Sequence, residues 1–284
     1  MKRLSVHYKR DLCGWGDQLR TVTGLITIID MLQKEGHDIE FGRILTERPE
    51  HLLLKHVDAY EEAHNSLPSF GLGDLYQYLL WNAPEIISSV KEILLKHIHE
   101  KDLVLYHFNL PLLWLWNFRQ PRMDLCRLLE FKEPFESEYR KYRQSIGDEF
   151  FGVQARFDDH DSFSVQSFPP QDQVKYLLDW MDDITALFRN RPVFCTTSNF
   201  QVTELLKKRY NFITPKRVPN HSRQFVDKQD FFQMRLFSES IRNFVYIGAT
   251  HHRDFGCGFS MAPAYLGNVP VVYKAYCGDS VVFE

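Results

Sequence analysis

Three short segments of the chain combine glycine, arginine and small polar residues in ways that suit an anionic ligand. The first, Gly14-Trp15-Gly16-Asp17-Gln18, lies between an expected strand at 4–8 and an expected helix. Glycines let a backbone approach a ligand closely, and a helix N-terminus attracts anions. The same pattern is also typical of a plain tight turn, so this segment alone leaves both interpretations open.

The second segment ends in a single arginine. An apolar strand is expected at 151–157, and it carries Arg156 near its end, followed by DDHD at 158–161. A guanidinium donates a bidentate pair of hydrogen bonds to a phosphate or carboxylate, which favours an anion site. The following acids equally allow a salt bridge at the rim of the sheet.

The third segment, GCGFSMA at 256–262, follows the expected strand NFVYIG and begins a short helix. Small residues there leave backbone amides free to bind an anion. A Gly-rich connection without a ligand is the competing interpretation.

The elements that must position these segments alternate between strands and helices. A stripe of apolar residues predicts a helix with one buried face, closed by Gly36; its members are Leu19, Val22, Leu25, Ile26, Ile29 and Leu32. Repeated alternation predicts parallel sheets covered on both faces. The charged stretch 130–144 has no strong apolar stripe, so it is interpreted as the link between a domain at 1–145 and a domain at 146–284.

Composition excludes several classes of protein. The chain has 284 residues and a net charge of -3, which does not favour a nucleic-acid partner. Its five cysteines include no CxxC pair, so a structural zinc site or disulfide framework is not expected. No stretch approaches the ~20 apolar residues of a membrane span. A cytoplasmic location is therefore expected, and the lack of a membrane anchor favours a bacterial or viral setting.

Taken in order, four motifs resemble the GT-B fucosyltransferase superfamily, which includes nodulation and core α1,6-fucosyltransferases, protein O-fucosyltransferases and bacterial α1,2-fucosyltransferases. GWGDQL resembles the Gly-x-Gly-Asn-Gln-Leu loop of that group, and GVQARFDD resembles its GVHIRxGD strand. FCTTSN resembles the FxATD strand, and GFSMAPAYLG resembles the Ser-Phe-Ser element that begins a helix. The order and spacing agree over most of the chain.

The resemblance implies an α/β, GT-B-like fold, with two Rossmann-like domains facing across a cleft. It implies an inverting glycosyltransferase that moves L-fucose from GDP-fucose to a glycan acceptor hydroxyl and requires no metal or other cofactor. The domain at 1–145 would be the acceptor side, and the domain at 146–284 would bind the nucleotide sugar. Arg156 would neutralise the departing diphosphate. The other donor-binding residues implied are Gly14, Gly16, Gln18, Gln154, Thr197, Ser198, Asn199, Gly258, Phe259 and Ser260.

The chain departs from the family pattern at four of these positions. Gln154 stands in place of a histidine, Ser198 in place of an aspartate and Gly258 in place of a serine. Asp17 replaces the asparagine of the first loop. A carboxylate there could be the general base that takes the acceptor proton, or it could be the N-cap of the following helix.

Two alternatives stay open. Asp159-His160-Asp161 fits the Asp-x-Asp motif by which GT-A glycosyltransferases hold a divalent metal, and 251–254 (HHRD) could add ligands. That interpretation leaves GWGDQL and GFSMAPAYLG unexplained. The substitutions at Ser198 and Gly258 also allow a catalytically degenerate protein that binds a glycan or a nucleotide without transferring sugar.

Overall fold

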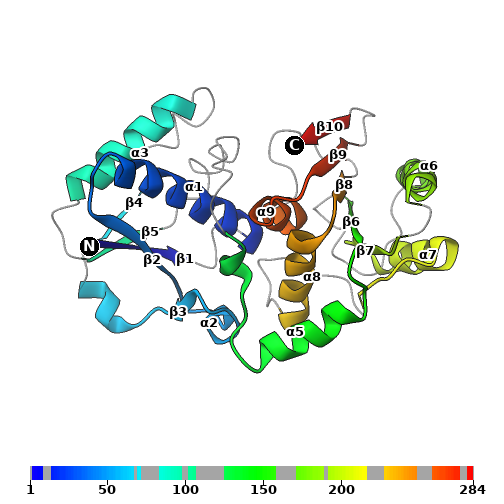
Figure 1. Ribbon diagram of the computed structural model, residues 1–284, viewed down its shortest axis with the longest axis horizontal. Helices are drawn as coiled ribbons and strands as arrows, with labels where there is room; N and C mark the ends of the chain where they lie inside the picture. Colours follow the sequence, from blue (N-terminus) through cyan, green and yellow to red (C-terminus); the bar gives the residue numbers. More distant parts are fainter. Residues whose placement is uncertain are drawn as a thin grey trace. The chain divides into compact units, whose positions relative to one another are not determined.

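The fold is seen in a computed structural model that describes residues 2–8, 14–66, 69–71, 83–97, 102–106, 125–157, 171–188, 191–215, 227–247, 258–275 and 280–283. The chain divides into two compact units, Met1–Lys132 and Glu133–Glu284, each built on its own five-stranded sheet (Figure 1). Among the described residues, no helix has both the length and the apolar character needed to cross a bilayer.

The sheet of the first unit has the strand order β3-β2-β1-β5-β4, and every pairing in it is parallel. Its strands are β1 (Lys2–Tyr8), β2 (Ile39–Thr46), β3 (Val57–Ala59), β4 (Ser69–Gly71) and β5 (Asp102–Tyr106). The helical segments are α1 (Trp15–Lys34), α2 (Glu50–Leu53), η1 (Glu62–Ser66), α3 (Ala83–His97) and η4 (Cys126–Leu129). Because parallel strands share one carboxyl edge, the segments that follow β1 and β2 meet there.

Helix α1 confirms the predicted apolar face. All six residues of the predicted stripe are buried, with exposures of at most 3%. The helix ends as expected at Gly36, whose φ of 92° is in the left-handed region. Gly36 N–H donates to the Gln33 carbonyl, and His37 N–H donates to the Leu32 carbonyl. This pair of bonds is a Schellman motif, which satisfies carbonyl groups that the helix end leaves unpaired.

The sheet of the second unit has the order β10-β9-β8-β6-β7, in which only β10 is antiparallel to its neighbour. Its strands are β6 (Phe151–Arg156), β7 (Val193–Thr197), β8 (Asn243–Ile247), β9 (Val271–Ala275) and β10 (Ser280–Phe283). The helices are α5 (Phe135–Gln144), α6 (Gln171–Leu187), α7 (Phe200–Tyr210), α8 (Lys228–Glu239) and α9 (Gly258–Leu266). In Figure 1, α6 and α7 lie on one side of this sheet, and α8 and α9 lie on the other.

The alternation of β6 assigns its residues to these two faces. Val153 and Ala155 belong to the apolar core shared with α6 and α7. Gly152 and Gln154 point the opposite way, since successive strand residues alternate between faces. At Gly152 a Cβ atom would lie 2.8 Å from a ring carbon of Phe237 on α8, which explains why a strand interior carries glycine.

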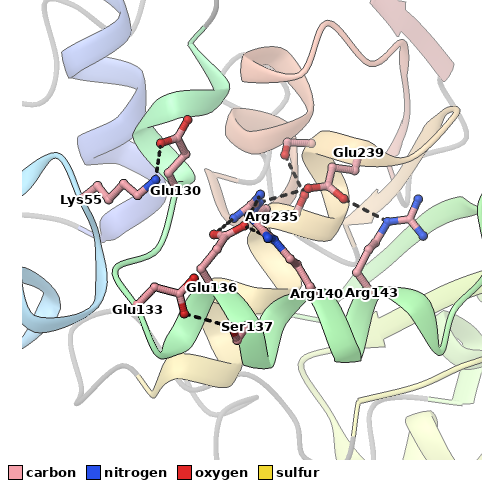
Figure 2. A network of polar contacts seen from close by, with 10 residues as sticks. Lys55, Glu130, Glu133, Glu136, Ser137, Arg140, Arg143, Arg235 and Glu239 are labelled. Carbon is pink, nitrogen blue, oxygen red and sulfur yellow. Dashed lines mark hydrogen bonds and ion pairs between the residues drawn. The ribbon is translucent and has the colours of Figure 1, made fainter.

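Helix α5 packs against α8 through aromatic side chains and through the charged side chains that Figure 2 shows. Glu136 on α5 and Arg235 on α8 form an ion pair of 2.6 Å, and Arg143 pairs with Glu239 at 3.0 Å. The ring of Tyr139 on α5 lies under the Arg235 guanidinium, 4.3 Å from its central carbon. The stretch 130–144 was expected to link the two domains, but most of it, residues 135–144, forms a helix that lies within the second unit.

Helices α8 and α9 approach each other closely at one glycine. A Cβ atom on Gly267, the residue after α9, would lie 1.8 Å from the carbonyl oxygen of Ser238. Only a residue without a side chain fits this contact, because real Cβ atoms do not come within 3.0 Å of such an atom. The glycine at the end of GFSMAPAYLG therefore serves helix packing.

Candidate functional site

Arg156 is the last residue of β6, a central strand of the second sheet, and it is half-buried. In open α/β sheets, ligands bind beyond the carboxyl ends of the strands, so this position suits a ligand contact. Ser198, which follows the neighbouring strand β7, forms two hydrogen bonds with the end of β6. Its hydroxyl accepts a hydrogen bond of 3.0 Å from Phe157 N–H, and its own N–H donates to the Ala155 carbonyl at 3.1 Å.

Thr197 and Asn199 organise the start of α7. The Asn199 side chain is the N-cap of α7 and accepts hydrogen bonds from Gln201 N–H and Val202 N–H. The Thr197 hydroxyl lies 2.9 Å from the hydroxyl of Thr203 on α7 and donates to the Asn199 carbonyl at 2.6 Å. Both side chains are buried and engaged within the protein, so their contact with a nucleoside stays a prediction.

Gln154 belongs to a buried polar group on the α8 side of the sheet. It lies beside Thr196 in the parallel pairing of β6 and β7. The Thr196 hydroxyl donates a bond of 3.1 Å to the carboxamide oxygen of Gln233 on α8. Gln154 Oε1 and Gln233 Nε2 are buried and have no hydrogen-bond partner among the residues that the structure describes. The structure therefore leaves a buried acceptor on Gln154, two residues before Arg156, and a buried donor on Gln233 of α8.

Sequence reasoning missed Thr196 and Gln233 in this group. Thr197 was predicted as a site residue, but Thr196 is the one that shares a face with Gln154. The alternation of β7 could have indicated this. Cys195 points into the apolar core, so the next residue, Thr196, points to the opposite face of the sheet. Gln233 gave no comparable signal, because a single glutamine within a helix has no distinctive spacing.

Gly258, Phe259 and Ser260 form the first turn of α9. The first N–H groups of a helix have no partner within it, so they are available to an anion. Ser260 is fully buried, and its hydroxyl has no hydrogen-bond partner within the described part of the chain. The Ser260 carbonyl accepts a bond of 3.1 Å from the side chain of Asn243, which anchors this turn to the start of β8.

In the first unit, α1 begins earlier than predicted. Gly14 is its N-cap, with φ -78° and ψ 161°, and Trp15 is its first residue. Gly16 and Asp17 therefore lie in the first helical turn, and the expectation that Asp17 is the N-cap is wrong. Gln18 is fully buried, and neither atom of its carboxamide has a partner among the described residues.

The predicted metal ligands lie outside the described residues, both at 159–161 and at 251–254. Within the described ranges, no group of three or more His, Cys, Asp or Glu side chains is arranged to hold a metal ion.

No protein-family model and no curated protein matches the sequence. Solved structures match over nearly the whole chain. NodZ α-1,6-fucosyltransferase co-crystallised with GDP, a protein from Bradyrhizobium, matches with a TM-score of 0.59 and 11% identity. This match covers 100% of this chain and 99% of that one.

Two further solved structures match in the same way. POFUT1 in complex with GDP gives a TM-score of 0.53 at 10% identity, covering 94% of this chain and 95% of that one. A variant of Arabidopsis thaliana FUT1 in complex with GDP gives 0.53 at 14% identity, covering 96% and 70%. The chain therefore has the α/β, GT-B-like fold of these fucosyltransferases, which confirms the fold class and the fold-level resemblance predicted from the four motifs.

Proposed function

We propose that the protein is an inverting glycosyltransferase that moves L-fucose from GDP-fucose to a hydroxyl group of a glycan acceptor. The second unit binds the nucleotide sugar, and the first unit binds the acceptor. The acceptor oxygen attacks C1 of the sugar, the bond from C1 to the diphosphate breaks, and its electron pair leaves with GDP. No metal is required in this scheme.

The position of Arg156 carries the proposal. The step creates negative charge on the departing diphosphate, and preorganised donors aimed at developing charge lower a reaction barrier. Arg156 supplies a permanent positive charge at the carboxyl end of β6, where ligands of such sheets bind. The N–H groups of Gly258–Ser260 belong to the first turn of α9, where no partner within the helix exists, and their dipoles suit the same group. NodZ and POFUT1 have both been solved with GDP, which supports a GDP-sugar donor.

The remaining predicted contacts come from both units. Gln154 offers a carboxamide in place of the family histidine, and this group can hydrogen-bond the base or a phosphate of the donor. Gly14, Gly16 and Gln18 are proposed as donor contacts from the first unit, and Asp17 as a candidate base. Thr197, Ser198 and Asn199 remain proposed nucleoside contacts, although their side chains and several of their backbone groups are hydrogen-bonded within the protein.

The bonding of the Thr197, Ser198 and Asn199 side chains within the protein favours a second candidate function. If these side chains stabilise the strand end and the helix start and do not contact a nucleoside, the protein could bind a nucleotide or glycan without transferring sugar. Donor binding without turnover distinguishes this candidate from the first.

Calorimetric titration of GDP, UDP and GDP-fucose, with and without EDTA, tests the donor assignment. GDP binding that survives EDTA is expected. Binding of UDP alone, abolished by EDTA, would refute the assignment and direct attention to Asp159 and Asp161.

Arg156→Ala tests the residue that carries the proposal. A hydrogen bond to a charged group contributes about 1.5–3 kcal/mol, so GDP affinity should fall roughly 10- to 150-fold. Arg191→Ala is the matched control, because Arg191 lies before β7, is half exposed and pairs with Glu149. If Arg156→Ala binds and turns over the donor as well as Arg191→Ala does, Arg156 has no such role.

A further inference from the structure

A carboxylate and an imidazole meet at the carboxyl edge of the first sheet, outside the predicted site residues. His7 is the penultimate residue of β1, and Glu47 directly follows β2. The two strands are parallel neighbours, with His7 beside Leu45. His7 Nε2 and Glu47 Oε1 are 2.8 Å apart. The Gly14–Gln18 segment follows β1 at this same edge.

The imidazole ring is held from several directions. Only 2% of the His7 side chain is exposed, and its ring stacks on Tyr60, with centroids 3.7 Å apart and planes 8° from parallel. Tyr60 is in turn fixed by its N–H, which donates to the Thr46 carbonyl, and by its hydroxyl, which donates to Asn65 Oδ1 at 2.9 Å. The ring therefore presents Nε2 to Glu47 in a defined orientation.

Glu47 differs from the next acid in the chain. Glu50 is 1% exposed and pairs with Arg48 at 2.9 Å, and Arg48 also donates to the hydroxyl of Tyr8. Glu50 is therefore buried and already paired with a cation. The Glu47 side chain is 54% exposed, so a molecule in solution can reach it.

The hydrogen bond assigns roles to the atoms of the pair. An ionised carboxylate only accepts hydrogen bonds, so His7 donates through Nε2–H. This bond occupies Glu47 Oε1 and leaves Oε2 to take a proton from another molecule. Transfer to a hydroxyl nucleophile needs such a base, positioned by a group that fixes its orientation.

We propose that Glu47 is the general base that deprotonates the acceptor, and that His7 is the residue that positions it. This inference rests on the proposed function. As the acceptor oxygen bonds to C1 of the sugar, its proton passes to Glu47 Oε2, and the electron pair of the broken C1–O bond leaves with GDP. The proton then passes from Glu47 to solvent. Under this proposal Asp17, which lies in the first turn of α1, is not the base.

The test uses the full-length protein and measures GDP release from GDP-fucose with water as the acceptor, since the same base activates water. Glu47→Gln should lower kcat by about 10²- to 10⁴-fold and leave the Kd for GDP unchanged. Glu40→Gln is the matched control, because Glu40 lies at the other end of β2 and also forms an ion pair, with Arg3 at 2.9 Å. Its kcat should equal that of the wild type.

His7 is tested by two variants. His7→Phe retains a stacking ring but loses the donor, so kcat should fall with KM for GDP-fucose unchanged. His7→Gln restores an N–H group and should recover part of the lost rate, which a purely structural role would not predict.

The outcomes separate the two proposals. If Glu47→Gln turns over as fast as Glu40→Gln, or if the loss is found only in Asp17→Asn, Glu47 is not the base and the proposed function stands. If the wild type binds neither GDP nor GDP-fucose, the proposed function itself fails. If the wild type binds GDP-fucose but releases no GDP, the assignment of a base fails along with sugar transfer, and nucleotide binding remains.

Discussion

Replacing Arg235 with leucine removes one partner of a nearly buried ion pair between α8 and α5. The Glu136 side chain is 7% exposed and the Arg235 side chain 18%, and two nitrogen–oxygen contacts of 2.6 and 3.3 Å join them. Burial, the largest single effect, acts to lower the pKa of Arg235, but the hydrogen bond to Glu136 and the electrostatic effects of Tyr139, Glu136 and Glu239 together outweigh it and raise that pKa. The charge on Arg235 is thus strongly coupled to Glu136 (Figure 2).

The expected cost follows from the carboxylate that is left behind. Removing one partner of a buried pair costs about 3–5 kcal/mol, because the remaining charge is buried without compensation. Arg140 stays 3.2 Å from Glu136, but its side chain is 69% exposed, so it compensates only in part. Arg235→Leu should therefore destabilise the second unit by about 3 kcal/mol, at the lower end of that range.

Urea unfolding at neutral pH, followed by circular dichroism, measures this cost. The double variant Glu136→Leu/Arg235→Leu should be within about 1 kcal/mol of the wild type, since a buried pair is often replaced by apolar residues without loss. The control is Arg209→Leu, which breaks an exposed pair with Asp182 and should cost less than about 1 kcal/mol. The reasoning is refuted if Arg235→Leu is no less stable than Arg209→Leu, or if the double variant is as unstable as Arg235→Leu.

Three further predictions follow. Gly267→Ala should lower the free energy of unfolding by at least about 2 kcal/mol in urea titrations, because its Cβ would lie 1.8 Å from a carbonyl oxygen of α8. Gln233→Leu and Thr203→Val each remove a buried hydrogen bond to neighbouring residues of β7 and should lower stability similarly, but calorimetry should find weaker GDP binding only for Gln233→Leu. Equal GDP affinities would contradict this. Burial raises the pKa of the Cys195 thiol to about 12. The associated stability is present in full below the unfolded pKa of about 8.5 and is lost as pH rises toward 12, so a Cys195→Ala variant should show a smaller decline in urea midpoint between pH 8 and 11.

The fold could be predicted because its signals are periodic and local. The apolar stripe of α1 and the alternation of β6 each specify a buried face within a few turns or residues. The end of α1 was predictable from Gly36, since the left-handed conformation favours glycine. Its beginning was not, because Gly14 caps the helix with its backbone alone and gives no side-chain signal.

Helix α5 illustrates a limit of periodicity. Its sequence has few apolar residues, which favoured an interpretation as a linker. It is held instead by ion pairs and by Tyr139 and Tyr142, both of which pack on Phe232 of α8. The partners of this charged segment lie almost a hundred positions further along the chain. The local sequence pattern therefore gives no sign that the segment forms a packed helix.

The site was predictable only where a motif carried it. Arg156 and Ser260 occupy the strand end and helix start that their motifs predict. Gln233 and Thr196, like His7 and Glu47, are brought together across 37 and 40 positions of the chain. Pairs of this kind depend on which strands become neighbours, and a single sequence does not state that order.

The attachment of α5 to α8 also bears on how the chain could be divided or recombined. A cut after residue 145 would separate Glu136 and Tyr139 from Arg235 and expose the aromatic surface of Phe232. A cut before Glu133 would keep these partners together. If relatives ever exchanged their N-terminal halves, crossovers that preserved folding would have fallen upstream of α5, so this helix should share its ancestry with the second unit.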